Sequence, residues 1–549
     1  MSEMRRGDTG QFDDPVSEQG EPGHFWTRTN AGEASPGVLT PLAWTLWRDQ
    51  LELAMRQAFC DIGLLDPDDV HVVTTTDERM VGCFFGRAAA NIDHVRAYFE
   101  RMPHTSGAEW EEKMQGAQRS VEDSPSTPSR VVDRDVSTEW DRLRNETPKQ
   151  LAELRGAQYD WWRRSVESEA EMGPIGAGER FAEAVARFRL AMRLHARQRY
   201  LMQSAHSQIA QMAKTLDRPD LEMALMSGYG GMEETQVAVD LWHVSRDDLS
   251  LHQFLELHGY HGPGEGAMHN RSWREDPRPV EVIADRYRVL DDDHDPQRRA
   301  QRVHETRARA EAEVLEAMAP DQRARALEIW NYVREGVVAT TVGKASFLMA
   351  IDAARAAARS IGSQLAADGV IRQADDVFFF TVDELVGELP ADARGQVEFR
   401  RSRHAEYLRM VLPESWTSPA PAVRIDELDD EELEGDVFVG TPASPGVAEG
   451  PARVMTDPAD QDVQPGEVLI AELTDPSWVA VMMLSAGLVV DVGGPASHAA
   501  IVARELGVPC IVNTKTGTRR LSTGDIVRVD GTAGTVEVLH RIDERSGEL

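Results

Sequence analysis

A histidine that follows a glycine turn is the residue of this sequence best placed to do chemistry. Residues 491–513 read DVGGPASHAAIVARELGVPCIVN, a pattern that predicts a buried strand, a tight turn, a helix and a second strand. Ser497 is a favourable N-cap residue, which places His498 in the first turn of the helix. Gly507 and Pro509 are expected to end that helix.

The start of a helix favours chemistry on anions. Its backbone N–H groups are unpaired and its dipole is positive, so it attracts a phosphate. An imidazole in that field tends to stay neutral and nucleophilic. We therefore expect His498 to form a transient phosphohistidine, which divides one phosphoryl transfer into two. The alternative is that the glycines form only a turn and His498 is a surface residue.

The same stretch resembles a known family. GGPASHAAIVARELGVP is similar to the signature of the swivelling phosphohistidine domain of the PEP-utilising enzymes, which include phosphoenolpyruvate synthase, pyruvate phosphate dikinase and rifampicin phosphotransferase. The resemblance implies that His498 is the catalytic residue of a phosphotransferase. It also implies that Gly493, Gly494 and Ser497 hold the phosphate, with Arg504 as a further candidate.

Composition limits the class of protein. The chain has 549 residues, enough for more than one domain, and a formal net charge of -34, which argues against nucleic-acid binding through a basic surface. Three widely separated cysteines, without metal-ligand spacing, suit a reducing cytoplasm. No membrane span or signal peptide is evident from the sequence, so we expect a cytoplasmic protein that does not bind membranes.

The pattern of apolar residues predicts a multidomain protein with five segments. We expect a disordered leader (1–23) and a large, mainly helical substrate-binding domain (24–412). An acidic flexible linker (413–436) should follow, then a small β/α swivelling phosphohistidine domain (437–541) and a tail (542–549). Helical periodicity is expected over 140–154, 178–216, 299–318, 322–336 and 345–368, whereas 375–385 is similar to a short strand and turn of the family.

A glycine-rich loop is the second place where chemistry is expected. Residues 254–276, FLELHGYHGPGEGAMHNRSWRED, are similar to a loop of rifampicin phosphotransferase-like proteins, with departures at His261 and Ser272. The resemblance implies that His261, Glu265 and Arg274 position or deprotonate the acceptor hydroxyl. Two alternatives are a solvated polar loop and a metal site formed by His258, His261 and His269, whose spacing matches no standard zinc pattern.

Other segments also resemble this family. Residues 28–42 preserve its order of Arg, Asn, Gly-Glu, Pro-Gly and Pro-Leu, and Arg334-Glu335 matches an Arg-Glu pair. Lys344 lies further along the chain than the lysine that follows this pair in the family. We expect the aromatic residues and methionines of the helices to be mainly core residues, some of which could line a cavity.

The sequence contains no evident site for a phosphoryl donor. It lacks a Walker-type loop and any segment resembling an ATP-grasp domain or a PEP-binding barrel. We therefore expect this chain to bind no cofactor itself, and a separate ATP-grasp protein to bind ATP and Mg²⁺. The expected activity is transfer of the phosphoryl group from His498 to the hydroxyl of a small molecule. The alternatives are a phosphohistidine carrier or regulatory protein, and a non-catalytic ligand-binding scaffold.

Overall fold

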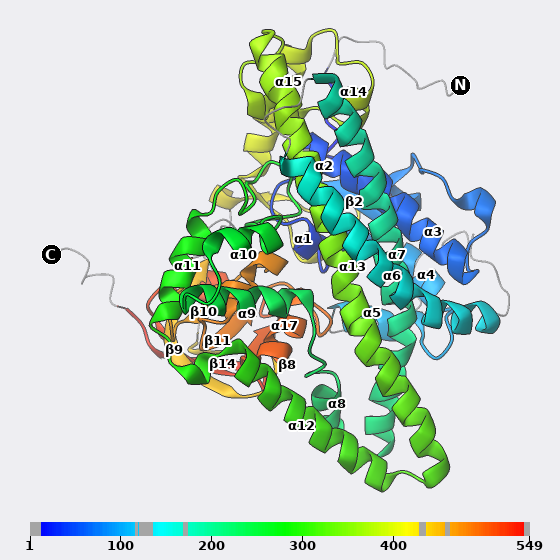
Figure 1. Cartoon of the computed structure of the whole chain (residues 1–549), viewed down its shortest axis with the longest axis vertical. Coiled ribbons are helices and arrows are strands. Elements are labelled where there is room, and N and C mark those ends of the chain that lie inside the picture. The colour runs from blue at the N-terminus through cyan, green and yellow to red at the C-terminus, as the bar shows by residue number, and fades with distance from the viewer. Residues whose placement is uncertain are drawn as a thin grey trace.

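The chain folds into a large helical part and a smaller C-terminal part built on a sheet. The structure, a computed structural model, describes residues 12–115, 119, 136–167, 174–427, 435–455 and 462–542. We name residues 12–427 the helical domain and residues 435–542 the C-terminal domain. Figure 1 shows the C-terminal domain lying beside the green helices α9 (Glu233–Ser245) and α11 (Arg278–Arg288). The predicted multidomain fold class is confirmed.

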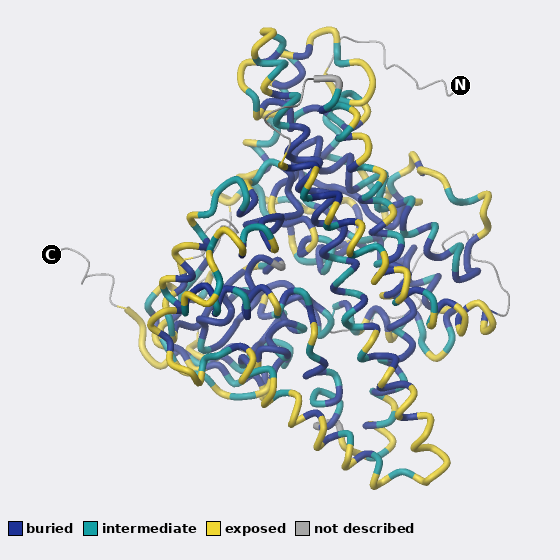
Figure 2. Tube along the Cα trace, in the orientation of Figure 1, coloured by how far each residue is buried: buried dark blue, intermediate teal, exposed yellow. Residues whose placement is uncertain are grey.

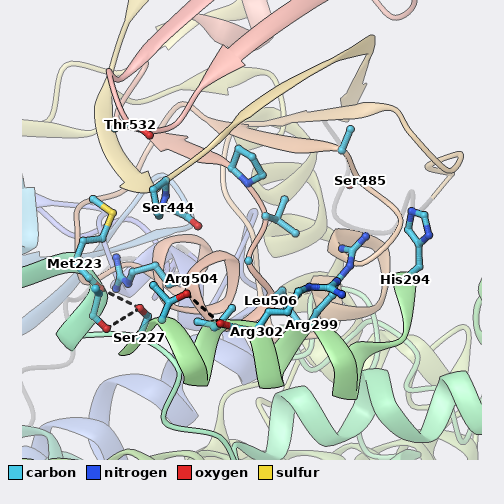
Figure 3. Close-up of a pocket in the computed structure, with 18 of the residues that line it drawn as sticks. Met223, Ser227, His294, Arg299, Arg302, Ser444, Ser485, Arg504, Leu506 and Thr532 are labelled. Atoms are coloured by element: carbon cyan, nitrogen blue, oxygen red, sulfur yellow. Dashed lines mark hydrogen bonds between the residues drawn. The ribbon is translucent and has the colours of Figure 1, made fainter. Parts of the chain in front are cut away.

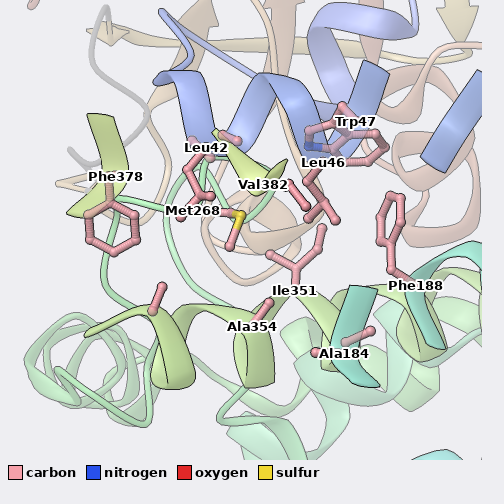
Figure 4. Close-up of a cluster of buried hydrophobic side chains, with 14 of the residues drawn as sticks. Leu42, Leu46, Trp47, Ala184, Phe188, Met268, Ile351, Ala354, Phe378 and Val382 are labelled. Atoms are coloured by element: carbon pink, nitrogen blue, oxygen red, sulfur yellow. The ribbon is translucent and has the colours of Figure 1, made fainter. Parts of the chain in front are cut away.

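Three long helices form the framework of the helical domain. They are α6 (Ser137–Glu167), α7 (Pro174–Thr215) and α13 (Pro320–Ala367), and α13 packs along the other two. Helix α2 (Pro41–Leu46) and α3 (Glu52–Ile62) lie against them, and their apolar faces form one buried cluster. In Figure 4, Leu42 and Trp47 face Phe188 of α7 and Ile351 of α13 across this cluster.

Helix α13 runs without a break where the sequence predicts two helices separated near residue 340. Its glycines are tolerated because they allow close packing on α7: a Cβ at Gly336 would collide with Met202 Sδ, and one at Gly343 would lie 3.0 Å from His195 Cβ. The helix is long and apolar enough to cross a membrane, but 72% of its most apolar window is buried inside the fold. It is therefore placed as a core helix.

Residues far apart in the sequence meet in a small antiparallel sheet. Its strand order is β2-β3-β1-β5, with β2 (Val81–Phe84), β3 (Arg87–Asn91), β1 (Phe25–Thr27) and β5 (Ser415–Thr417). The last strand lies in the segment predicted as a flexible linker. Trp416 is buried at 4% exposure beside Trp26 and Phe84, and this packing orders the first half of that segment. Residues 428–434 of the predicted linker lie outside the described residues.

Two further segments differ from the sequence predictions. Residues 12–23, assigned to a disordered leader, pack on the helical domain: Val16 is 1% exposed and the Glu18 carboxylate pairs with Arg79 at 2.5 Å. The predicted strand at 375–385 is instead a 3₁₀ helix (Ala374–Phe379) followed by α14 (Val382–Val386). Capping boxes at both helix starts satisfy the backbone N–H groups there.

The helical domain contains seven further α-helices and a strand pair among the described residues. They are α1 (Ala31–Ala34), α4 (Ile92–Phe99), α5 (Gly107–Gln115), α8 (Pro219–Leu225), α10 (Leu251–His258), α12 (Pro296–Ala317) and α15 (Ala393–Tyr407), with the strand pair β4 (Met410–Val411) and β6 (Val423–Arg424). Figure 2 shows that the hairpin of α12 and α13 is exposed at its tip, whereas buried chain fills the region between the two domains.

The C-terminal domain is one eight-stranded sheet with short helices. The strand order is β7-β14-β13-β9-β10-β11-β12-β8, and the four strands from β9 to β12 are parallel. The strands are β7 (Val437–Val439), β8 (Thr441–Ser444), β9 (Val447–Met455), β10 (Val468–Ala471), β11 (Gly487–Val490), β12 (Cys510–Val512), β13 (Ile526–Asp530) and β14 (Thr535–His540). The helices are α16 (Val479–Met482), α17 (His498–Leu506) and α18 (Gly517–Arg520). The predicted strand–turn–helix–strand unit around His498 is confirmed.

An apolar cluster is shared by the two domains. Trp242 of α9 and Ile283 of α11 belong to the same buried cluster as Trp478, Val502 and Leu506 of the C-terminal domain. The Tyr287 hydroxyl donates a hydrogen bond to the Ala480 carbonyl at 2.7 Å across this contact. The domains are therefore docked through a buried apolar surface, which favours this arrangement by the hydrophobic effect.

Candidate functional site

His498 occupies the position that the sequence predicts, at the first residue of α17. The Ser497 hydroxyl accepts a hydrogen bond from the Ala500 N–H at 3.3 Å, so Ser497 is the N-cap. Gly507 ends the helix in the left-handed conformation, with φ 63°. Burial lowers the pKa of His498 well below its ordinary value, and the nearby Lys344 ammonium lowers it further. The imidazole is therefore neutral at physiological pH, as a phosphoryl-accepting nucleophile must be.

The two ring nitrogens of His498, a residue that lines a cavity, have different surroundings. Nδ1 lies 3.4 Å from Thr474 Oγ1, whereas Nε2 is buried and has no hydrogen-bond partner among the described residues. The backbone N–H of His498 donates to Glu33 Oε2 of the helical domain at 3.1 Å. A carboxylate therefore lies at the positive start of α17, where a phosphate would also be favoured.

The cavity beside His498 lies between the two domains and has a volume of about 230 Å³. Helices α7 and α13 supply most of its wall, and the C-terminal domain closes it with Ala496, His498, Ile501 and Val502. The other lining residues are Asn30, Glu33, Ala34, His195, Arg199, Met202, Gln203, His206, Met232, Glu234, Glu265, Val337, Thr340, Thr341, Lys344, Phe347 and Leu348. This site combines an apolar wall with convergent polar groups, as ligand sites do.

Two cations line this cavity. Lys344 Nζ lies 3.3 Å from Glu234 Oε1, so its charge is partly balanced. Arg199 has no recorded hydrogen bond or ion pair with any of the described residues. Burial lowers the pKa of His195 and of His206 to about 3 each, so both rings are neutral beside these cations.

The glycine-rich loop contributes a carboxyl group to the same cavity. His261 Nδ1 lies 2.7 Å from Glu265 Oε2, whereas Glu265 Oε1 is buried without a partner among the described atoms. Burial raises the pKa of Glu265 to about 8 and lowers that of His261 to about 4. His261 does not line the cavity itself, so it positions the Glu265 side chain.

The other predicted site residues have different surroundings. Arg274 Nε pairs with Asp352 at 3.2 Å and is not among the lining residues of the cavity. The Arg504 guanidinium donates to the carbonyls of Ala443 and Pro495, each at 3.0 Å, and so braces the turn before α17. Neither arginine lines the cavity beside His498, so the substrate-binding role of Arg274 and the phosphate-binding role of Arg504 stay predictions.

The glycine pair lies at the contact between the domains. A Cβ at Gly494 would collide with the Met114 carbonyl oxygen, and it would lie 2.9 Å from the Lys113 carbonyl oxygen at the end of α5. A Cβ at Gly493 would lie 3.2 Å from Ser497 Oγ. Gly494 therefore permits the C-terminal domain to approach the helical domain closely.

The three histidines of the glycine-rich loop do not converge on one point. His258 Nε2 lies 2.7 Å from Asp240 Oδ2, His261 binds Glu265, and the His269 ring packs edge-on against His404 at 5.8 Å between centroids. Among the described residues, no group of three or more potential metal ligands comes together.

A second and larger cavity, of about 1030 Å³, opens on the other side of α17. Figure 3 shows Arg299 and Arg302 of α12 facing the C-terminal domain, with Leu506 and Ser444 on the opposite wall. Of the predicted site residues, only Arg504 lines this cavity. It is therefore separate from the reactive face of His498.

We expect three buried carboxyl groups to make the docking of the domains depend on pH. Burial raises the pKa of Glu33 and of Asp475 to about 7 each and that of Glu265 to about 8. The Gly264 N–H donates to Asp475 at 3.0 Å across the domain contact, beside Glu265. A raised carboxyl pKa means that the docked form prefers the protonated group. The stabilisation of the docked form by these protonated carboxyl groups is thus fully present below about pH 4.5, and it is lost as pH rises through 7 to 8.

We expect the docked fraction to fall as the pH rises from 6 to 8.5. Dyes attached to the two domains would report this as a loss of energy transfer. The Asp475→Asn variant should show a smaller change, because one of the three titrating groups is then absent. Docking that becomes tighter at pH 8.5 would contradict the prediction.

Several lining residues were not among the predicted site residues. Arg199 and His206 lie on α7, Glu234 on α9 and Lys344 on α13. Arg199, His206 and Glu234 belong to helical stretches in which no local signal marks them, whereas Lys344 was noted only through the family's Arg-Glu pair. Glu33 could have been found, because it belongs to the Gly-Glu pair of the family-like segment at residues 28–42.

Comparisons with known proteins agree with the geometry of the site. Residues 463–534 match the model of the PEP-utilising enzyme mobile domain, and residues 248–338 match that of the rifampicin phosphotransferase fourth domain. The first match includes His498, and the second includes the glycine-rich loop from α10 onward.

Similar proteins occur in several bacteria. A rifampicin phosphotransferase of Streptomyces sviceus is 32% identical over 305 residues, which cover 53% of this chain and 34% of that protein. One of Bacillus subtilis is 33% identical over 177 residues, 32% of this chain and 20% of that protein. An uncharacterised protein of Mycobacterium tuberculosis is 38% identical over 195 residues, 35% of this chain and 22% of that protein. The matches thus span 34% or less of the length of each of these relatives. The chain is therefore similar to rifampicin phosphotransferases over part of its length, and its C-terminal part matches the mobile domain of the PEP-utilising enzymes.

Proposed function

We propose that this protein is a cytoplasmic phosphotransferase component that carries a phosphoryl group on His498 and delivers it to the hydroxyl of a small molecule. The observation that carries the proposal is the placement of His498: it lines a cavity that Lys344 and Glu265 also line, and its buried Nε2 has no hydrogen-bond partner among the described atoms. A carrier without an acceptor of its own would need no such cavity against the reactive ring. This favours an enzyme over a regulatory carrier or a scaffold.

The second half-reaction can be written from the residues of the cavity. The acceptor hydroxyl oxygen attacks phosphorus, an O–P bond forms, and the N–P bond to His498 Nε2 breaks. The electron pair of that bond returns to the ring. The hydroxyl proton passes to Glu265 and finally to the imidazole, which becomes neutral again. The Lys344 ammonium would stabilise the charge on the phosphoryl oxygens during transfer.

The first half-reaction needs a donor, which we propose is bound by a separate ATP-grasp protein. ATP with Mg²⁺ would supply the phosphoryl group there. In the docked arrangement His498 is only 9% exposed, so it must leave the acceptor cavity to be phosphorylated. This requires the apolar contact between α16, α17 and the helices α9 and α11 to open, so that the C-terminal domain moves away from the helical domain.

Labelled ATP tests this proposal. The full chain is incubated with γ-labelled ATP, with and without a candidate ATP-grasp protein, and with extracts of small molecules as acceptors. Acid-labile label on His498 that moves to a small molecule would support the phosphotransferase. Label that stays on His498 would indicate a carrier, and absence of label with every donor would indicate a scaffold.

Replacing Glu265 with glutamine is expected to slow only the second half-reaction. General-base catalysis contributes about 10²- to 10⁴-fold, so discharge of phospho-His498 should slow by at least the lower factor. Because the pKa of Glu265 is about 8, the rate of discharge by the unmodified protein, corrected for the docked fraction at each pH, should increase as pH rises toward 8 and then level off. The variant should lose this dependence.

The matched control is Glu183→Gln, which changes a carboxylate on the outer face of α7 that pairs with Arg187 at 2.9 Å. It should alter neither half-reaction. Single-turnover measurements of loading and of discharge separate the two steps. Slower loading of His498 in the Glu265→Gln variant would place Glu265 outside the acceptor step.

A further inference from the structure

The cavity beside His498 contains a cation whose charge is not balanced by the protein. Arg199 projects from α7 into the cavity and has no recorded ion pair or hydrogen bond with any described residue. Much of its surface is accessible, yet burial lowers its pKa. The side chain borders the cavity between the domains, where it is accessible to an anionic group of a ligand.

The carboxylates of the cavity do not supply an anion to Arg199. Glu234 pairs with Lys344, and Glu265 binds His261. Glu33 attracts Arg199 electrostatically but accepts the backbone N–H of His498 and forms no ion pair with Arg199. The two histidines near Arg199, His195 and His206, are neutral. The anion is therefore expected to come from the ligand.

The size and the wall of the cavity limit the rest of that ligand. About 230 Å³ is below the range of roughly 300–1,000 Å³ that is typical of ligand pockets. Met202, Val337, Phe347 and Leu348 form an apolar surface beside Arg199. The cavity thus suits a short apolar body with an anionic group at one end and, toward His498, a hydroxyl group.

We propose that the acceptor is a small hydroxycarboxylate, whose carboxylate pairs with Arg199 while its hydroxyl group lies against His498. This inference rests on the proposed function and specifies its substrate class. The planar guanidinium forms two parallel hydrogen bonds with a carboxylate, which fixes the direction of the ligand. The hydroxyl group is phosphorylated by the step written above, and no further reactant is needed.

Matched pairs of acceptors test the inference. His498 of the full chain is first phosphorylated with potassium phosphoramidate, and loading is checked as acid-labile phosphate. The loaded protein is then offered glycolate, lactate or 3-hydroxybutyrate, each beside its uncharged amide. Acid-stable phosphate ester is measured over time. Transfer to the acid should exceed transfer to the amide by about 10- to 150-fold, the discrimination that hydrogen bonds to a charged group supply.

The variant Arg199→Gln should remove most of that preference while loading is unchanged. Arg187→Gln is the control, because Arg187 lies on the same helix but pairs with Glu183 at the surface. Equal transfer to acid and amide would overturn the inference, as would transfer to neither. Loss of transfer to both in Arg199→Gln would also overturn it, since Arg199 would then hold the phosphoryl group. Failure of His498 to load would instead count against the proposed function.

Discussion

Replacing His498 with alanine is expected to abolish both loading and delivery of the phosphoryl group. Two other nitrogen groups that line the cavity already have partners, since His195 Nδ1 bonds to the Thr340 carbonyl at 3.0 Å and Lys344 is paired with Glu234. Removing a covalent nucleophile typically costs on the order of 10⁶-fold in rate. The measurement is acid-labile phosphate on the protein after treatment with labelled donor.

The His498→Ala variant should remain folded. Alanine is favourable in a helix, and the Ser497 cap does not involve the imidazole. The melting temperature should therefore change little. A matched control is His252→Ala, which removes a histidine whose side chain is 83% exposed. Full phosphoryl transfer by His498→Ala would refute the assignment of the nucleophile.

The part of the site that could be predicted from the sequence is the part held by local interactions. The N-cap Ser497, the terminating Gly507 and the following Pro509 are adjacent in the chain, so their spacing alone specifies α17 and places His498 at its start. His261 and Glu265, which pair within the glycine-rich loop, are only four positions apart, so the sequence could predict both as site residues.

The rest depends on contacts between distant segments. Arg199, Glu234 and Lys344 converge only because α7, α9 and α13 pack together, and no one helix shows this in its own periodicity. Composition also gives a wrong prediction of flexibility where an isolated aromatic residue packs against a residue far away in the sequence. Trp416 orders part of the predicted linker by packing against Trp26, 390 positions earlier in the chain.

Replacing Gly494 with alanine is expected to separate the two half-reactions. The alanine keeps the backbone N–H that the phosphate would use, but its Cβ collides with the carbonyl oxygen of Met114 when the domains dock. Overpacking of this kind costs typically about 1–3 kcal/mol, or roughly 5- to 150-fold in the docking equilibrium. Delivery to an acceptor should slow by that factor, because it requires the docked state.

Chemical loading of His498 should show the opposite effect in this variant. Potassium phosphoramidate reaches the ring only when the domains separate, since docked His498 is 9% exposed. Access to the ring is expected to be limited by separation of the domains. The rate at which phosphoramidate loads His498 should therefore rise by the same factor by which the docking equilibrium is weakened. Gly156→Ala is the control, because a Cβ there meets no atom within 4 Å. Slower loading of Gly494→Ala would show that this glycine acts on the phosphate and not on the contact between domains.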